Sequence, residues 1–340
     1  MAESRRALPV VALYAVIALL AGGAYFCSAT DYTVALPLVG DTRLYVHHST
    51  LAQMLMLALC TAAMLTLTTR HSMIRIYSRM DTCSYLMLSV MSVGVLFQFQ
   101  PPAGGGEGWG IIHCYAVQLC LLLFYTLIFD TYQKPGARGK LFAAFVCIGV
   151  ASLFFIQIVL LVPLLWLFVA RNMMVTGPRV LAASLMGVLL PYWFLAAFCV
   201  LTGDVEPLAR RASSLSVFVM PGDWRLAVAG VDVNTLVTTA FILLLSVTGM
   251  VHFARNSYKD RIRVRMIYEF IMCVSVSAAF LAAAQPQHIL MVLGILIVNA
   301  SLLTGHYIAL TSTRCTSVSV VALIAVTLGI TVFNVYGCSV

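Results

Sequence analysis

Two aspartates, Asp31 and Asp41, follow the first apolar segment of the chain and could support carboxylate chemistry. A carboxylate can act as a general base toward a hydroxyl group, and an arginine can hold a phosphate. We therefore take both aspartates as candidate catalytic residues. The alternative, that these and the binding candidates are only solvated loop residues, stays open. The candidate substrate-binding residues are Arg43, His47, His48, His113, Arg210, Arg211, Asp223 and Arg225.

No spacing of cysteines and histidines predicts a metal site. The ten cysteines contain no C-x-x-C pair, and neighbouring side chains such as His47 and His48 diverge on a strand or helix. Cys27 and Cys338 fall at predicted outer helix ends and could pair in an oxidising compartment. The glycine-rich stretch 104–106 lacks the strand and helix that flank a phosphate-binding loop, so it does not predict phosphate binding. The sequence identifies no cofactor, and the cofactor stays unknown.

The composition places these residues in a membrane protein. Of the 340 residues, 62% are hydrophobic and 9% are charged, and the mean hydropathy is +1.00. Soluble domains carry about 25% charged residues. The net charge of +8 is therefore first explained by topology and anionic lipid, and a nucleic-acid partner is not expected.

The apolar segments predict an all-α bundle of transmembrane helices that forms one domain over residues 1–340. One segment, 141–170, is 30 residues long. As a single helix it would span about 45 Å, against about 30 Å of hydrocarbon. It is either one long tilted helix, which gives about ten spans, or a hairpin, which gives about eleven. The ten segments are 7–26, 51–69, 83–100, 111–130, 141–170, 180–202, 234–252, 267–284, 289–310 and 317–336.

The distribution of basic residues favours the hairpin. Lysine and arginine gather on the cytoplasmic side of a membrane protein. With a cytoplasmic N-terminus, the hairpin places 16 of the 20 basic residues inside, whereas a single helix places 11 inside and 9 outside. The hairpin leaves loops 27–50 and 203–233 as the longer outer connections. Function often concentrates in loops, so the candidate chemistry is expected on the outer face.

The predicted spans hold few charged residues, and these have simple structural explanations. Asp130 could pair with Lys134, and Glu269 follows Arg265 by four residues, which suits a helical ion pair. His306 lies in the inner half of its segment. Because ion-coupled transporters usually need buried carboxylates, this pattern weakens a transporter function.

The stretch RNSYKDRIRVR, at 255–265, holds five basic residues. A polybasic segment beside a span attracts anionic lipid at about 1 kcal/mol per residue. We expect it to lie at the cytoplasmic face and to contact lipid head groups. The expected contact residues are Arg255, Lys259, Arg261, Arg263 and Arg265.

Three longer stretches carry a family resemblance. They are RIYSRMDTCSYLML (75–88), FDTYQKPGARGKLFAAFVCIGVASLFF (129–155) and VLAASLMGVLLPYWFL (180–195), followed by the basic run at 255–265. Together these resemble an uncharacterised multi-pass inner-membrane family of the Bacteroidota. The resemblance implies a helical envelope protein in the inner membrane and supplies no site residues. A carboxylate just outside the first span is also similar to the architecture of membrane glycosyltransferases that use lipid-linked sugars.

These observations favour a membrane protein of cell-envelope biogenesis that acts on a lipid-linked or glycan-type substrate at its outer face. Whether it is an enzyme stays open. The alternatives are a non-enzymatic subunit that positions partner proteins, or a lipid or small-solute transporter. For the subunit, the helix containing Gly187 and Pro191 could pack closely against other helices.

Overall fold

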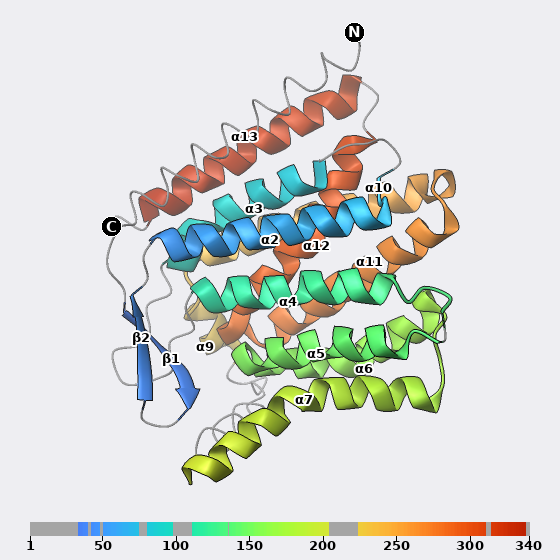
Figure 1. Cartoon of the computed structure of the whole chain (residues 1–340). Helices are drawn as coiled ribbons and strands as arrows, with labels where there is room; N and C mark the ends of the chain where they lie inside the picture. Colours follow the sequence, from blue (N-terminus) through green and yellow to red (C-terminus); the bar gives the residue numbers. More distant parts are fainter. Residues whose placement is uncertain are drawn as a thin grey trace.

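The structure of the chain is a computed structural model (Figure 1). It describes residues 33–39, 42–47, 50–74, 80–97, 111–134, 136–203, 224–310 and 314–337. The elements of the first half are β1 (Thr33–Val39), β2 (Thr42–His47), α2 (Thr50–His71), α3 (Met80–Phe97), α4 (Ile111–Phe129), α5 (Arg138–Phe154), the 3₁₀ helix η1 (Ile156–Leu161) and α6 (Val162–Phe168). Those of the second half are the π-helical turn η2 (Val169–Met173), α7 (Pro178–Thr202), α9 (Trp224–Ala229), α10 (Val233–Asn256), η3 (Ser257–Lys259), α11 (Ile262–Ala284), η4 (Pro286–His288), α12 (Ile289–Ala309) and α13 (Arg314–Gly337).

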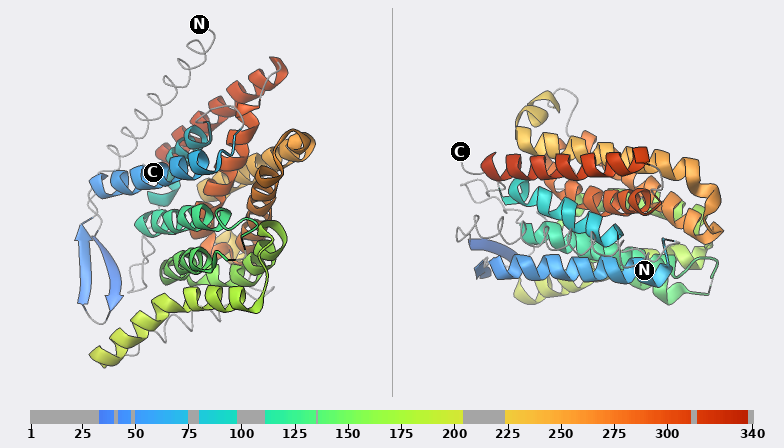
Figure 2. Two further views of the ribbon diagram at one scale, coloured as in Figure 1. Left: turned by 45° about the vertical axis from the view of Figure 1, so that its right-hand side comes forward. Right: turned by 90° about the horizontal axis from the view of Figure 1, so that it is seen from above.

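The long helices run roughly side by side and form one bundle around α12 (Figures 1 and 2). Every residue of α12 from Met291 to His306 is buried, and helices α3, α4, α10 and α11 all pack against it. A helix that is apolar on all sides suits either lipid or a position among other helices. Close contacts at Gly294, against Cys114, and at Gly305, against Asp81, let neighbouring helices approach α12 and hold it at the centre.

The outer surface of the bundle is apolar, in contrast to that of a soluble protein. On α7, the side chains of Met186, Trp193 and Phe194 are 63%, 74% and 65% exposed. Seven described helices are long and apolar enough to cross a membrane. These features confirm a helical, membrane-embedded class of protein. The total number of spans, the membrane and the side on which the N-terminus lies stay predictions.

The long apolar segment 141–170 folds back on itself. Helix α5 ends at Phe154, and Phe155 is extended, with φ −138° and ψ 92°. The backbone N–H of Gln133 then donates to the carbonyl of Met173 at 3.0 Å, so both ends of the segment lie at the same end of the bundle. Pro163 cannot donate a backbone hydrogen bond, which suits the first turn of a new helix. The fold-back is the one predicted from the distribution of basic residues.

Glycines allow α5 and α7 to pack closely. A Cβ added at Gly149 would lie 2.6 Å from the carbonyl oxygen of Val188, and one added at Gly187 would lie 2.6 Å from that of Phe142. Each glycine therefore permits backbone contact that any larger residue would prevent. The sequence analysis suggested that the helix containing Gly187 could pack closely against other helices. In the structure, Gly187 packs against α5 of the same chain.

The predicted outer loop 27–50 contains regular structure. Strands β1 and β2 pair antiparallel, with Thr33 opposite His47 and an irregularity between Leu36 and Val39. Figure 1 shows this hairpin beside the start of α2, at one end of the bundle. Both strands are rich in β-branched residues, which favour extended backbone. The bundle confirms the all-α fold class, and this short hairpin is an addition that the sequence analysis did not predict.

Candidate functional site

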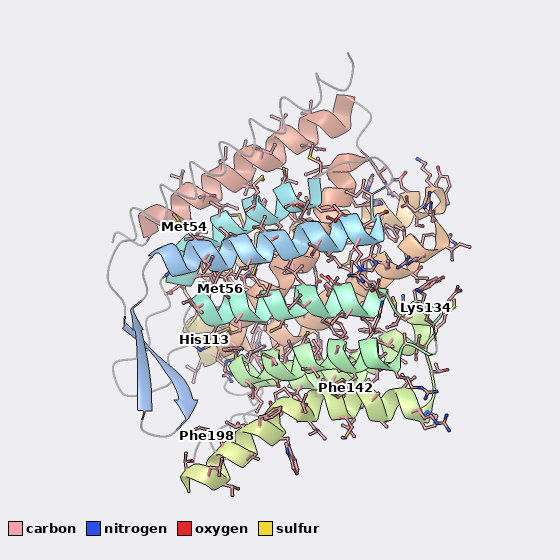
Figure 3. The ribbon with its side chains drawn as sticks, in the orientation of Figure 1. Met54, Met56, His113, Lys134, Phe142 and Phe198 are labelled. Atoms are coloured by element: carbon pink, nitrogen blue, oxygen red, sulfur yellow. The ribbon has the colours of Figure 1, made fainter. Side chains whose placement is uncertain are left out.

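The two ends of the bundle differ in charge. We call one of them the basic end, because α2 and α4 end there, α3, α5, α7 and α11 begin there, and nearly all basic side chains of the described helices and turns lie there. Figure 3 shows Lys134 at the basic end and His113 at the opposite end, which we call the neutral end. The basic end holds Arg70, Lys134, Arg138, Lys140, Arg171, Arg179, Arg255, Lys259, Arg261, Arg263 and Arg265.

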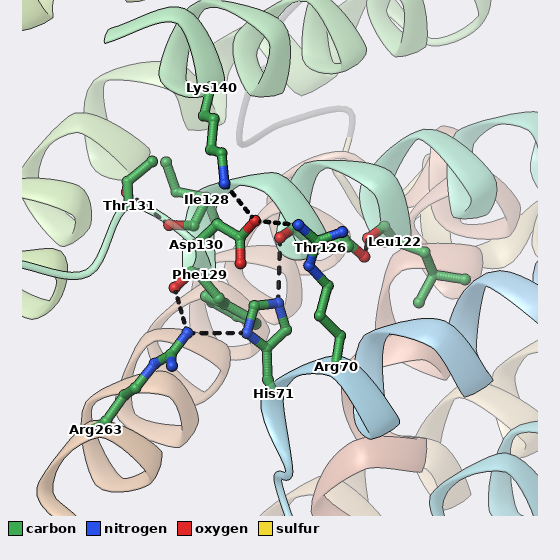
Figure 4. Close-up of polar contacts among 10 residues, drawn as sticks. All are labelled: Arg70, His71, Leu122, Thr126, Ile128, Phe129, Asp130, Thr131, Lys140 and Arg263. Atoms are coloured by element: carbon green, nitrogen blue, oxygen red, sulfur yellow. Dashed lines mark hydrogen bonds and ion pairs between the residues drawn. The ribbon is translucent and has the colours of Figure 1, made fainter. Parts of the chain in front are cut away.

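Asp130 lies at the basic end and is fully paired (Figure 4). Its carboxylate accepts hydrogen bonds from Arg70 and, at 2.8 Å, from Lys140. Burial raises the pKa of Asp130, but the hydrogen bonds and positive charges of Lys140 and Arg70 outweigh it and hold that pKa below its usual value. This carboxylate therefore stays ionised and joins α2, the end of α4 and α5.

His71 is held as a neutral imidazole by two neighbours (Figure 4). Its Nε2 donates to the carbonyl of Thr126 at 3.2 Å. The guanidinium of Arg263 lies 3.2 Å from His71 Nδ1 and donates to the carbonyl of Phe129 at 3.1 Å. Because Arg263 only donates hydrogen bonds, Nδ1 must act as the acceptor. Arg263 thereby binds α11 to the C-terminal end of α4, where a cation is favourable.

A second carboxylate at the same end, Asp81, has an opposite environment. The residue is 1% exposed, and neither carboxylate oxygen has a hydrogen-bond partner among the described residues. It lies against α12: a Cβ added at Gly305 would lie 2.5 Å from the Cα of Asp81. An unpaired ionised carboxylate in such a place costs several kcal/mol. This side chain is therefore suited to holding a proton or a small cation.

A buried chain of polar side chains lies beside Asp81. His306 is 1% exposed, and its Nε2 donates to Asp260 at 3.1 Å. The ring of Tyr268 lies 4.7 Å from the His306 ring and is fully buried, and the residue before His306, Gly305, is the one that packs against Asp81. Neither His306 Nδ1 nor the Tyr268 hydroxyl has a partner in the described part of the chain. Groups that exchange protons are thus placed together in a dry environment.

The carboxylates and imidazoles of the described residues do not meet in a geometry that could hold a metal ion. The Asp81 cluster, which we define as Asp81, Asp260, Tyr268, Gly305 and His306, instead combines two acids, one imidazole and one phenol. Such combinations carry out proton transfer. Charged groups buried inside membrane bundles usually mark ion or substrate pathways.

Most of the outer-face candidates lie outside the described residues. His113 is buried at the neutral end, with its ring 5.5 Å from that of Phe154. Arg225 is exposed in α9, while Arg43 and His47 lie in strand β2. Whether these candidates form one site stays a prediction. Asp31, Asp41, His48, Arg210, Arg211 and Asp223 fall outside the described ranges, as do Cys27 and Cys338.

The five residues expected to contact lipid all lie at the basic end. Arg255, Lys259 and Arg261 are exposed, and Lys259 donates to Asn256 at 3.0 Å. Arg263 uses its guanidinium for the contacts to His71 and Phe129. The Nε of Arg265 is buried. Contact with lipid head groups stays a prediction.

Two predicted ion pairs are wrong. Asp130 does not pair with Lys134, because α4 ends at Phe129 and the chain then turns, so the spacing of four residues no longer brings the two side chains together. Within the described helices, Glu269 does not pair with Arg265 either. It accepts instead from Asn172 at 3.4 Å.

Sequence reasoning missed Asp81 because its apolar segment was taken to begin at residue 83. The helix begins three residues earlier, at Met80, and includes Asp81 in its first turn. The signal was present as a lone acidic residue directly before an apolar run. The small residue that admits it, Gly305, is 224 positions away, and no sequence pattern connects the two.

The fold and this cluster define a membrane-embedded helical protein with ionisable groups buried at one end. No protein-family model, characterised protein or solved structure matches the chain.

Proposed function

We propose that this protein is a proton-linked membrane transporter for a small solute or lipid, in which Asp81 takes up and releases the proton. The observation that carries the proposal is the buried Asp81 carboxyl without a described partner. The argument against a transporter was that the spans lack buried carboxylates, and Asp81 removes that argument.

The neighbouring residues supply a route for the proton. The side chain of Asp260 is 7% exposed and accepts a hydrogen bond from His306. When Nδ1 carries the ring proton and Nε2 is the acceptor, a proton that arrives at Asp260 can pass to Nε2 while the Nδ1 proton leaves on the opposite side of the ring. The ring of Tyr268 lies beside that imidazole, at 4.7 Å. The cluster thus connects the rim of the basic end with the interface of α3 and α12.

The test is infrared difference spectroscopy of the reconstituted protein during a pH change. A carboxyl that gains a proton in a dry site gives a carboxylic-acid band that shifts in D₂O. We expect this band in the wild type and in Asp130→Asn, and its loss in Asp81→Asn. In liposomes containing a pH-sensitive dye, Asp81→Asn should also abolish proton movement driven by an imposed gradient. Retention of the band in Asp81→Asn would contradict the proposal.

Arg75 and Arg79 precede α3 in the sequence and lie outside the described residues, so a further control is needed. If Asp81 formed a structural ion pair with one of them, neutralising the arginine alone would destabilise the protein. Neutralising both partners would restore its stability. A proton site predicts no such rescue.

A second proposal is the function predicted from the sequence, in which the protein acts on a lipid-linked or glycan-type substrate at its outer face. It rests on the residue pattern of the sequence, in which Asp31 and Asp41 follow the first apolar segment. Its test is separate: Asp31→Asn and Asp41→Asn should abolish turnover of a lipid-linked sugar while proton uptake at Asp81 continues.

A further inference from the structure

Two chain reversals meet at the neutral end, and each contributes a buried glutamine. The first is the break after α5, which carries Gln157; the second is the turn between α11 and α12, which carries Gln285 and His288. Gln157 Nε2 lies 2.9 Å from His288 Nε2, and the ring of Phe155 lies 5.9 Å from the His288 ring. The fold-back of 141–170 therefore builds this group.

The two glutamines are buried with unused hydrogen-bonding atoms. Each is 1% exposed. The Oε1 of Gln157 and both the Oε1 and the Nε2 of Gln285 have no partner among the described residues. A buried amide without partners costs about 1–3 kcal/mol for each group left unsatisfied. Three such atoms, one on the residue that contacts His288 and two on the turn that carries His288, point to a ligand that completes them.

The charges at this end limit what that ligand is. Among the described helices and turns of the neutral end, the charged side chains are Arg225 and Asp232, and both are exposed. Among the described side chains, no buried counter-charge lies beside Gln157 and Gln285, and desolvating a charged ligand there would be costly. This favours an uncharged ligand group.

The donors and acceptors further define it. Amides and imidazoles both donate and accept hydrogen bonds, and a hydroxyl does the same, so adjacent hydroxyls complement this set. Trp224 lies next to the turn, where its indole nitrogen donates to the carbonyl of Ala283 at 2.8 Å while its ring is 44% exposed. An aromatic ring that is half exposed and held in place provides a flat apolar surface beside the polar groups.

We propose that the neutral end binds an uncharged, hydroxyl-rich group, such as a free sugar or the sugar head group of a glycolipid, through Gln157, Gln285 and His288. This binding does not depend on the proton chemistry of Asp81. Its loss and the failure of the proton site are therefore separate results.

The test uses protein purified in a sugar-free detergent and placed in phosphatidylcholine nanodiscs. Methyl glucoside is titrated in one arm, and monoglucosyl diacylglycerol is included in the nanodiscs in the other. The measurement is the shift in thermal unfolding temperature. A shift with methyl glucoside indicates a free solute, and a shift only with the glycolipid indicates a lipid head group. Both results support the proposal.

The variants are Gln285→Met and a matched control, Gln118→Met. Gln118 is also buried, but it accepts from Tyr85 at 2.5 Å and donates to Cys114 at 3.6 Å. We expect Gln285→Met to bind the sugar probe roughly tenfold more weakly, as for one lost hydrogen-bonding group. Without ligand it should unfold no earlier than the wild type, because methionine removes unsatisfied atoms. Gln118→Met should unfold earlier and keep its ligand-induced shift, and Asp81→Asn should also keep the shift.

Three outcomes would overturn the proposal. The first is that neither probe shifts the unfolding temperature of the wild type, or that the temperature shifts only when anionic phosphatidylglycerol replaces the glycolipid in the nanodiscs. The second is that Gln285→Met shows the same ligand-induced shift in unfolding temperature as the wild type. The third is early unfolding of ligand-free Gln285→Met, because this would show that the amide already has its partners within the protein.

Discussion

Asp130 and Asp81 lie at the same end of one bundle, yet their surroundings are opposite. The side chain of Asp130 is 13% exposed and has two cationic partners, each of which is about half exposed. Asp81 is 1% exposed and has no described partner. A carboxylate with two cations beside water stays ionised and joins helices. A carboxyl in a dry interface favours its protonated form and ionises when water or a positive charge reaches it, which is the property that a proton-coupled site needs.

The comparison also separates two uses of histidine. His71 has hydrogen bonds on both ring nitrogens and is fixed in one tautomer. His306 has a partner for one nitrogen, while the other is buried without a described partner. The first arrangement stabilises a structure, and the second leaves a position for a proton to arrive or leave.

The largest effect is expected from breaking the Asp260–His306 pair. Replacing His306 by leucine leaves a buried carboxylate without its partner, and we expect a loss of about 3 kcal/mol in the free energy of unfolding. The measurement is unfolding in mixed detergent micelles. Replacing Asp260 by leucine as well should recover part of this loss. If the two single losses simply add in the double variant, the pair is not coupled.

A smaller effect is expected when Asp81 is pushed away from α12. In Gly305→Ala the new methyl group would lie 2.5 Å from Cα and 2.8 Å from the backbone nitrogen of Asp81, and neither atom moves freely. We expect a loss of about 2 kcal/mol in the same measurement. The control is Gly329→Ala in α13, where nothing lies within 4 Å. Alanine should be neutral or stabilising there, and equal losses at both positions would contradict the close contact.

The Asp130 network should show a pH dependence with a defined sign. Its folded-state pKa is lowered, so its stabilisation is present above the unfolded-state pKa of about 3.9 and disappears as the pH falls through the lower folded value. Because the pairs are partly exposed, we expect Asp130→Asn to cost about 1 kcal/mol at neutral pH and almost nothing in strong acid. A cost that is independent of pH would show that charge is not the cause.

The smallest effect distinguishes the observed partner of Asp130 from the predicted one. Lys140→Gln should lower the free energy of unfolding by about 0.5 kcal/mol, because it removes an ion pair. Lys134 is exposed and does not pair with Asp130, so Lys134→Gln should change stability by less than about 0.5 kcal/mol and leave the acid dependence unchanged. Chemical denaturation at two pH values measures both, and a reversed order would restore the pairing predicted from the sequence.

Several features of the fold could be predicted from particular residues. The 30-residue length of segment 141–170 and the basic residues on both of its sides predicted the reversal that lies at Phe155. The alternation of strands β1 and β2 was missed, since a short hairpin at the end of a membrane bundle gives only a weak local signal. The Asp81 cluster was missed because three segments that are far apart in the sequence contribute to it: the start of α3, the start of α11 with the turn before it, and the end of α12.

The sequence by itself determined that this chain is a helical membrane protein, and it favoured a reversal in segment 141–170. The first follows from the hydropathy of individual segments, which acts through transfer from water to lipid. The second follows from the basic residues of the connecting segments, counted along the whole chain. Only the tertiary structure decided which carboxylate is paired and which is isolated. Partners such as Arg70 for Asp130 and Gly305 for Asp81 come from other helices. The cost of burying a charge depends on these neighbours, so chemistry at Asp81 becomes visible only once α3 and α12 are in contact.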